Sequence, residues 1–174
     1  MSRPQIRRLR AEDWAAYRDV RLRALADSPD AFGSTFASER SRADEEWRRR
    51  AANGSQSDQD LPLVLDDGEK LIGLAWGKVL PGEPDRAHLF QMWVAPEARG
   101  QGYGSALVGK VVEWVTSLGL DRIVLQVTEG DPPARHLYER AGFEPFGELQ
   151  PLRPGSSLQC QPMQLWLTPT GQHR

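Results

Sequence analysis

Hydrophobic and polar residues follow two different periods along this chain. Segments that alternate between apolar and polar positions, or that are apolar throughout, are typical of strands, whereas apolar positions three or four residues apart are typical of helices. The segments with strand patterns are residues 5–9, 62–66, 70–79, 87–94, 123–127, 146–149 and 163–167. The segments with helical spacing are residues 12–28, 38–52, 107–118 and 131–141. The pattern therefore predicts seven strands interleaved with helices.

Two of these segments carry charged or polar residues inside an apolar pattern. Arg21 interrupts the apolar stripe that Trp14, Tyr17 and Leu25 form on the first helix, and we expect its long side chain to reach water. Simple alternation along residues 87–94 places His88, Phe90, Met92 and Val94 on one face of a strand, and Leu89, Gln91 and Trp93 on the other.

The connections between the segments set part of the topology. Residues 66–69, Asp-Asp-Gly-Glu, predict a hairpin turn between two strands. A helix separates the strands at 87–94 and 123–127, so these two should be parallel neighbours with a right-handed crossover. Asp131 followed by Pro132 predicts the start of a helix, and Gly119 and Gly142 predict helix ends. Residues 168–174 are expected to form a loose tail.

Residues 99–105, Arg-Gly-Gln-Gly-Tyr-Gly-Ser, join the strand at 87–94 to the helix at 107–118. Glycines tolerate positive φ and carry no Cβ, so a ligand can approach their N–H groups closely. The first four N–H groups of a helix have no partner inside it, and the helix dipole is positive at this end. This segment is therefore expected to bind an anion, with phosphate best suited.

Other glycine-rich motifs describe this segment less well. A Rossmann loop needs G-x-G-x-x-G and an acidic residue after the next strand, but Asp121 precedes that strand. A Walker A loop needs Ser or Thr after Gly-Lys, and here Val111 follows Gly109-Lys110. A connection that merely turns the chain does not require three glycines and an arginine at these offsets.

Composition narrows the class of protein. The chain has 174 residues with 39% hydrophobic and 26% charged residues, as expected for one globular domain spanning residues 1–174. A net charge of −2 argues against non-specific nucleic-acid binding. No apolar run approaches the roughly 20 residues of a membrane span, and the N-terminus shows no secretory signal, so we expect a cytoplasmic protein without membrane partners. Cys160 is alone and His88, His136 and His173 are dispersed, so neither a disulfide nor a metal is expected.

Two motifs resemble a known family. Arg99-x-x-Gly102-x-Gly104, after a strand that ends Val-x-Pro, resembles the acetyl-CoA diphosphate loop of the GNAT family of N-acetyltransferases. Residues 134–143, Ala-Arg-His-Leu-Tyr-Glu-Arg-Ala-Gly-Phe, resemble the second GNAT signature. Both lie within residues 87–143, about a third of the chain. The resemblance implies the GNAT fold: a mixed α/β, seven-stranded sheet with helices on both faces, in which strands four and five splay apart to admit the pantetheine arm.

The resemblance also implies roles for individual residues. It assigns the diphosphate to backbone amides of Arg99, Gly100, Gln101, Gly102, Tyr103, Gly104 and Ser105. It assigns pantetheine contacts to the backbone of Met92 and Val94, and protonation of the departing CoA thiolate to Tyr138. Considered without the family, the periodicity favours Tyr138 as a core aromatic whose hydroxyl finds any partner.

The sequence departs from the family pattern at two positions. Asp131 stands where many members have asparagine; it can cap the helix but cannot donate an amide hydrogen to the cofactor. His88 stands at one position where many members have a glutamate base, and a neutral histidine could accept the proton of the amine. The alternative for His88 is a strand histidine that is hydrogen-bonded near the surface.

These expectations combine into an enzyme that transfers an acetyl group from acetyl-CoA to an amine by direct attack, without a metal and without Cys160 as nucleophile. The alternative is a GNAT-fold module that binds acyl-CoA without turnover. The acceptor, a small molecule or a peptide, is expected between Asp30, Phe32, Phe36 and Glu39 on one side and residues 151–157 on the other. Acids beside aromatics suit a cationic amine, but the sequence does not choose among amines. Homodimers are common in this fold, and the sequence identifies no interface.

Overall fold

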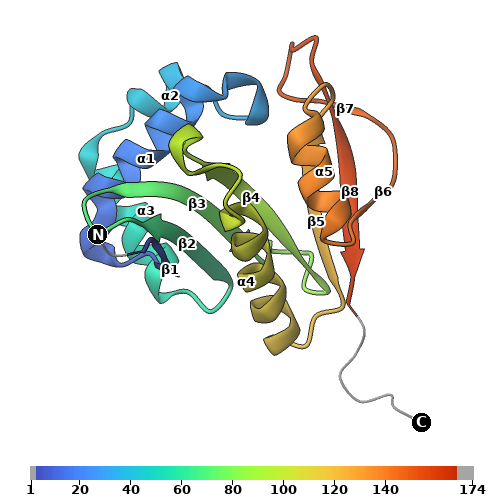
Figure 1. The fold of residues 1–174 in the computed structure, drawn as a ribbon, viewed down its shortest axis with the longest axis horizontal. Coiled ribbons are helices and arrows are strands. Elements are labelled where there is room, and N and C mark those ends of the chain that lie inside the picture. The colour runs from blue at the N-terminus through green and yellow to red at the C-terminus, as the bar shows by residue number, and fades with distance from the viewer. Residues whose placement is uncertain (1–2, 168–174) are drawn as a thin grey trace.

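The computed structural model of the chain describes residues 3–167, so the predicted tail at 168–174 lies outside the described residues. One mixed sheet runs through the molecule in the order β1-β2-β3-β4-β5-β8-β6, with β7 also paired to β8 (Figure 1). The strands are β1 (Gln5–Arg8), β2 (Asp60–Asp66), β3 (Leu71–Lys78), β4 (Arg86–Val94), β5 (Arg122–Thr128), β6 (Glu144–Pro145), β7 (Gln150–Pro151) and β8 (Gln159–Trp166). The mixed α/β fold with a parallel β4–β5 pair is thus confirmed, with eight strands instead of seven.

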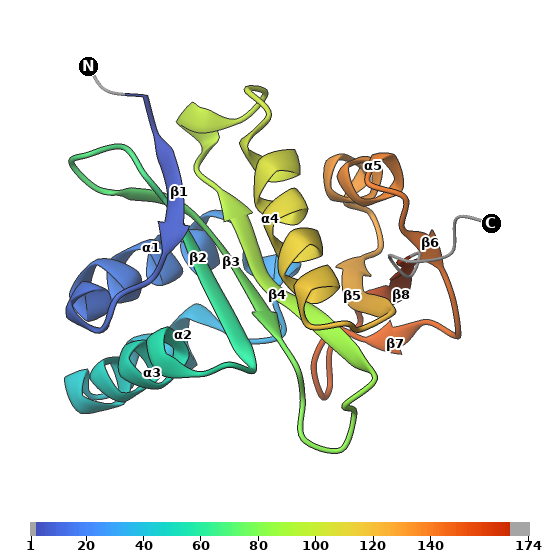
Figure 2. The same ribbon diagram turned by 90° about the horizontal axis from the view of Figure 1, so that it is seen from below.

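Helices cover both faces of the sheet, as Figure 2 shows from below. The α-helices are α1 (Trp14–Asp27), α2 (Phe36–Arg40), α3 (Asp44–Gln56), α4 (Tyr103–Ser117) and α5 (Pro132–Arg140). The short 3-10 turns are η1 (Ala11–Asp13), η2 (Pro29–Ala31) and η3 (Pro96–Ala98). One hydrophobic core lies under α1 and α3 and includes Tyr17 and Trp47. A second core lies under α4 and α5 and includes Leu107, Val111 and Ile123. Burial of each such large apolar side chain contributes about 1.5–3 kcal/mol.

β4 and β5 pair along only part of their length. Their parallel register joins Arg86 to Arg122, Ala87 to Ile123 and His88 to Val124, and pairing ends there. β4 continues to Val94 and β5 to Thr128, where β5 stays paired with β8 on its other side. The predicted splay between the fourth and fifth strands is therefore present, and it leaves strand edges that face each other without a ladder between them.

A bulge in β4 changes which residues share a face. The β3–β4 register slips by one residue between Trp76↔Phe90 and Leu74↔Trp93, and Gln91 has a φ of 56°. An extra residue on one strand reverses the alternation beyond it. The prediction of one face for His88, Phe90, Met92 and Val94 is therefore wrong. Phe90 lines a cavity beside α1, and Trp93 belongs to the core under α1 and α3. Leu89 and Met92 pack against the core under α4, and Val94 contacts both cores.

Two predicted elements differ from the structure. The single helix expected at 38–52 is α2 and α3, which are separated by Ser41, Arg42 and Ala43. Thr35 caps α2, and three acidic residues occupy the first turn of α3, where they complement the helix dipole. The strand expected at 146–149 is absent, and the two-residue strands β6 and β7 lie on either side of it. Gly147 has a φ of 66°, which takes the backbone out of the extended region.

Two side chains expected on particular surfaces lie elsewhere. Arg21 is 5% exposed and does not reach water as predicted. Its guanidinium lies over the ring of Phe32, 4.7 Å from the ring centroid. Leu118, the last residue of the apolar spacing that predicts a helix at 107–118, is the C-cap of α4 and is 37% exposed. Gly119 follows it with a φ of 73°, as expected for the residue that ends a helix.

Candidate active site

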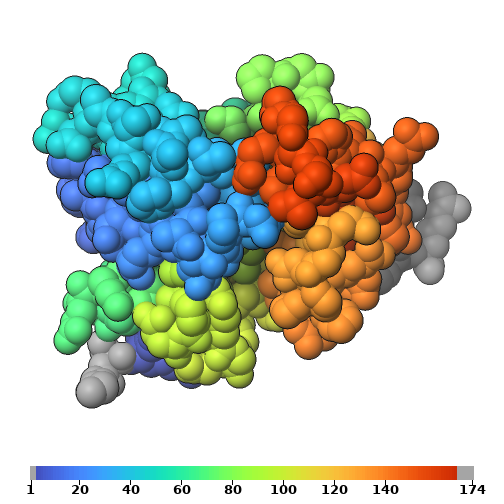
Figure 3. Space-filling model, turned by 90° about the horizontal axis from the view of Figure 1, so that it is seen from above, coloured from blue at the N-terminus to red at the C-terminus, as the bar shows by residue number. Residues whose placement is uncertain are grey.

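A cavity of about 440 Å³ occupies the gap where β4 and β5 diverge. Its walls come from β4, the loop after β4, the start of α4, the second half of β5, and α5. Figure 3 shows the surface hollowed between the blue α1–α2 segment, the yellow-green start of α4 and the orange α5. The apolar lining includes Met92, Ala134 and Leu137, which suits the aliphatic arm of a cofactor.

The loop before α4 presents a row of unbonded amides to this cavity. Among the described residues, no backbone N–H of residues 100–105 donates to a carbonyl or a side chain, and the first helical bond is from Ala106 to Gly102 at 3.0 Å. Gly100 and Gly102 have φ values of 75° and 88°, which L side chains rarely adopt. The amide of Arg99 differs from the others, because it donates to the carbonyl of Pro96 at 3.3 Å.

The side chain of Arg99 fixes this loop to the rest of the fold. Its Nε donates to the carbonyl of Val94 at 2.9 Å, and its Nη2 donates to Asp27 at 2.6 Å. The same carboxylate oxygen of Asp27 accepts from Nε1 of Trp93 at 3.0 Å. Burial acts to raise the pKa of Asp27, but the hydrogen bonds from Trp93, Ser28 and Arg99 outweigh it and lower the pKa. Arg99 is thus a structural clamp, and the Val94 carbonyl already accepts one hydrogen bond.

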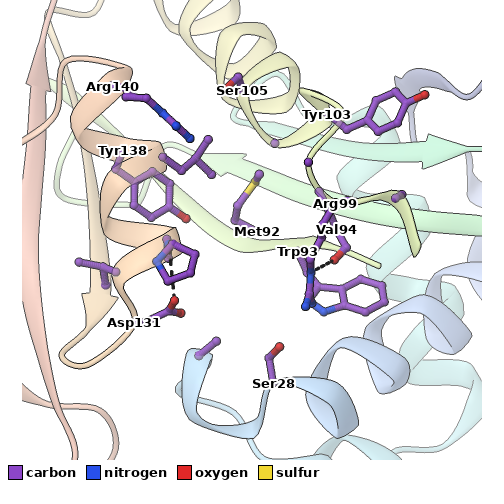
Figure 4. A pocket seen from close by; sticks show the side chains of 18 of the residues that line it. Ser28, Met92, Trp93, Val94, Arg99, Tyr103, Ser105, Asp131, Tyr138 and Arg140 are labelled. Atoms are coloured by element: carbon purple, nitrogen blue, oxygen red, sulfur yellow. Dashed lines mark hydrogen bonds between the residues drawn. The ribbon is translucent and has the colours of Figure 1, made fainter. Parts of the chain in front are cut away.

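Tyr138 enters the cavity from the opposite wall. Figure 4 shows its ring extending from α5 with the hydroxyl toward the centre of the cavity, where Met92 of β4 faces it. Tyr138 is 7% exposed, and burial together with the carboxylate of Asp131 raises the pKa of its hydroxyl. The hydroxyl makes no hydrogen bond to the described residues. It is therefore a protonated donor free to bond to a ligand.

The helix that carries Tyr138 begins as the sequence predicts. Asp131 is the N-cap of α5, and its Oδ1 accepts from the amide of Ala134 at 3.3 Å. Pro132 and Pro133 follow in the first turn, where a missing N–H costs no helical bond. Because the Asp131 carboxylate is used for capping, it orients α5 and so positions Tyr138.

Most of the predicted site residues line this one cavity. They are Met92, Val94, Arg99, Gly100, Gly102, Tyr103, Gly104, Ser105, Asp131 and Tyr138. Gln101 does not line it, and its side chain bonds to the carbonyl of Glu97 at 3.4 Å. Sequence reasoning missed Ser28, Gln126, Thr128 and Arg140, which also line the cavity. Of these four, Arg140 carried a signal, because it lies within the signature at residues 134–143.

His88, the predicted base, lies elsewhere. It belongs to the part of β4 that is still paired with β5 and does not line the cavity. Its Nε2 is 3.1 Å from Oε2 of Glu83, and its ring stacks on Phe90 with centroids 5.7 Å apart. This environment matches the alternative for His88, a hydrogen-bonded strand histidine.

The predicted acceptor residues are not brought together as a group. Glu39 lines a second cavity, whereas Asp30, Phe32 and Phe36 line neither of these two cavities. The loop at 151–157 approaches the α1–α2 connection through Arg153, which donates to the carbonyls of Pro29, Phe32 and Gly33. These bonds link the two halves of the molecule at one end of the splay.

The comparisons with known proteins agree with this geometry. A profile of the acetyltransferase (GNAT) family matches residues 10–143, well over half of the chain. This chain belongs to the GNAT acetyltransferase family. A mycothiol acetyltransferase from Salinispora arenicola is 35% identical over 131 residues, which are 74% of this chain and 40% of that protein. The chain therefore spans about two fifths of the length of this curated relative.

Solved structures resemble the whole GNAT fold of this chain. A GNAT acetyltransferase from Streptococcus pneumoniae has a TM-score of 0.81 at 20% identity, covering 95% of this chain and 100% of its own. A putative acetyltransferase from Salmonella typhimurium, solved with its cofactor acetyl-CoA, has a TM-score of 0.78 at 19% identity and covers 96% of this chain and 95% of its own. At these identities the likeness concerns the fold.

Two further findings concern what residues 3–167 contain. No helix in this part of the chain has the length and apolar character that a membrane crossing requires. No group of three or more His, Cys, Asp or Glu side chains in the same part is placed to hold a metal ion.

Proposed function

We propose that this GNAT domain transfers an acetyl group from acetyl-CoA to an amine by direct attack. The observation that carries the proposal is the row of free amides at residues 100–105, which opens onto the gap between β4 and β5. Free N–H groups at the positive end of a helix are suited to a diphosphate. The unpaired edges of the two strands are suited to the amide groups of a pantetheine arm, which can bond to backbone as another strand would.

The walls of the cavity supply groups for the chemical step. The amine nitrogen bonds to the thioester carbon, the carbon–sulfur bond breaks, and sulfur leaves with the electron pair. Backbone N–H groups on the open edge of β4 are available to stabilise the carbonyl oxygen as it gains charge. Tyr138 is directed at the same space and remains protonated at neutral pH, because its pKa is raised. Its hydrogen bond to sulfur strengthens as the thiolate forms.

The raised pKa refines the role of Tyr138. A free thiol has a pKa of about 8.5 and an ordinary tyrosine one of about 10, and the pKa of Tyr138 is raised further by burial and by Asp131. Complete transfer of the phenolic proton to the thiolate is therefore uphill, and Tyr138 acts chiefly as a hydrogen-bond donor to the developing charge. Solvent water then supplies the proton that converts the departing thiolate to the thiol.

A proton must also leave the amine. A lysine-type amine has a pKa of about 10.4, so its neutral form is scarce at pH 7. Because His88 is bonded to Glu83 and lies outside the cavity, we propose that solvent water, not His88, accepts this proton. Activity is then expected to rise with pH as the fraction of neutral amine rises.

The test is a thiol-release assay with acetyl-CoA and a panel of amines, followed by mass spectrometry of the acceptor. The proposal expects thiol release that depends on an amine, and a product that carries one added acetyl group on nitrogen. Acetyl-CoA binding by calorimetry without turnover of any amine would instead favour the non-enzymatic acyl-CoA module. Absence of acetyl-CoA binding would contradict both the proposed enzyme and the acyl-CoA-binding module.

A further inference from the structure

A second cavity lies on the other side of β4, facing α1 and α3. Its volume is about 380 Å³, and its lining includes Tyr17, Arg21, Glu39, Phe90 and Gln91. The β4 bulge separates it from the first cavity, because Phe90 and Gln91 line the second while Met92 and Trp93 line the first. Tyr17 donates to Oε1 of Gln91 at 2.7 Å and thereby supports the bulge. A molecule in the second cavity would thus lie across the strand from the proposed thioester.

Arg21 is a buried cation at this cavity, and among residues 3–167 no acidic side chain lies within ion-pair distance of it, although Glu39 acts on its charge from further away. Its side chain belongs to a residue only 5% exposed, and its Nη1 is buried with no hydrogen-bond partner among the described residues. The guanidinium stacks on Phe32, and burial lowers the pKa of Arg21. Buried polar groups are nearly always hydrogen-bonded, so an unpartnered guanidinium at a cavity indicates a group that binds there.

The nearby carboxylates are already used by other cations. Glu39 accepts from Arg50 at 2.8 Å and pairs with Arg42 at 3.2 Å. Asp60 accepts from Nε1 of Trp76 at 2.8 Å and lies 3.4 Å from Nζ of Lys78.

The lining of the second cavity carries more positive than negative charge. Its cations are Arg21, Arg49, Arg50 and Lys78, and its anions are Glu39 and Asp60. Arg49 and Arg50 also pair with Glu46, and Lys78 pairs with Asp60, so Arg21 is the lining cation left without an ion pair among the described residues. Glu39, one of the acids expected to attract a cationic amine, is paired with Arg42 and Arg50 in this cavity. An excess of positive charge favours an anionic group and disfavours a polyamine.

We propose that the second cavity binds a carboxylate of the acceptor through Arg21, and that the acceptor is an amine that also carries a carboxylate. This inference rests on the proposed acetyl transfer and adds the acceptor class to it. The planar guanidinium matches a carboxylate with two parallel N–H···O bonds. The acceptor would reach past the bulge, with its amine toward the thioester and its acid toward Arg21.

The test compares acceptors that differ only in charge at one end. L-amino acids and longer ω-amino acids are assayed beside their own carboxamides, with spermidine as a cationic comparison. The wild type is expected to have a kcat/KM about 10- to 100-fold higher for the acid than for its carboxamide, the scale of one charge-assisted hydrogen bond in a buried site. Arg21→Met should bring this ratio to about one, mainly through KM, and Arg21→Lys should retain part of it.

A matched control removes a cation outside the cavity. Arg48 is on α3 but does not line the second cavity, and its side chain is 47% exposed. Arg48→Met should leave the ratio within about twofold of the wild type. Loss of an unpaired buried cation should not lower the melting temperature of Arg21→Met, whereas a purely structural role for Arg21 requires a lower one. Equal wild-type rates on acids and carboxamides, or a preference for spermidine, would overturn the proposal.

A binding measurement separates this proposal from the proposed function. The wild type and Arg21→Met are titrated by calorimetry with N-acetyl amino acids and their carboxamides in the presence of CoA. If no amine is turned over, acetyl transfer fails, and selective wild-type binding of the acids still supports the Arg21 site. If amines are turned over and neither rate nor binding distinguishes acid from carboxamide, acetyl transfer stands and the Arg21 site is refuted.

Discussion

Replacement of Gly102 by aspartate and by asparagine tests whether the loop before α4 binds a diphosphate. Gly102 is the N-cap of α4 with a φ of 88°, and a Cβ built there meets no atom within 4 Å. Aspartate and asparagine are the residues other than glycine that best tolerate this backbone region, and both are good N-caps. The two variants therefore share strain, size and capping, and differ by one negative charge.

The size of the expected difference follows from the position of that charge. A carboxylate at residue 102 would lie about 5 Å from a diphosphate held by the neighbouring amides, where like charges repel by about 0.8 kcal/mol in water and about 3 kcal/mol at an effective dielectric constant of 20. Gly102 is exposed, so the value should lie between these limits. The aspartate variant should bind acetyl-CoA roughly 5- to 100-fold more weakly than the asparagine variant.

Calorimetric titration with acetyl-CoA measures this difference directly. Titrations at low and at about 1 M salt add an independent check, because the screening length falls to about 3 Å at 1 M and the gap between the variants should shrink. Titration with pantetheine, which carries no phosphate, is the control and should show equal binding to both variants. Equal affinity of the two variants for acetyl-CoA at low salt would refute the assignment of the diphosphate to these amides.

Three further substitutions test other parts of the structure. Tyr138→Phe should lower kcat about tenfold or more with acetyl-CoA affinity nearly unchanged, as rapid-mixing thiol release and calorimetry can show; a normal kcat would exclude Tyr138 from catalysis. His88→Gln should have a kcat/KM within about threefold of the wild type at every pH. A change in the shape of the pH–rate profile in this variant would instead show that His88 is the base. Burial acts to raise the pKa of Asp13, but hydrogen bonds from Arg7 and Arg10 outweigh this effect and lower the pKa from 3.8 to about 2. The ionised carboxylate should contribute about 2 kcal/mol of stability, which is present above about pH 4 and is lost as pH falls toward about 2. The free energy of unfolding of Asp13→Asn, measured with urea, should therefore be about 2 kcal/mol lower than that of the wild type at pH 7 and nearly equal to it near pH 2.

Local patterns were sufficient for much of this fold. Alternation identified the strands of the central sheet, and helical spacing identified α1, α4 and α5, because burial of one face imposes a period on the sequence. The glycines before α4 identified one helix start, since Gly102 has a positive φ that few other residues adopt. The Asp131-Pro132 pair identified another, since aspartate caps a helix and proline fits its first position. These signals are local in the chain, and so they can be read without the tertiary structure.

The errors arose where one segment depends on another. The bulge at Gln91 is supported by Tyr17, 74 residues away, and no pattern within β4 announces it. It reverses the faces of the strand and so separates His88 from Met92. The environment of Arg21 likewise depends on α3 and β4, whose residues line the same cavity. Nη1 of Arg21 has no hydrogen-bond partner among the described residues.

The sequence by itself determined the order of the elements and the loop that offers its amides, because backbone conformation is encoded within a few residues. Only the tertiary structure decided which side chains meet. It brought Tyr138 to the gap beside Met92, removed His88 from it, and placed an unpaired Arg21 at a second cavity across the strand. Contacts between distant segments follow from how sheets, bulges and helices pack together, and that packing is a property of the whole chain.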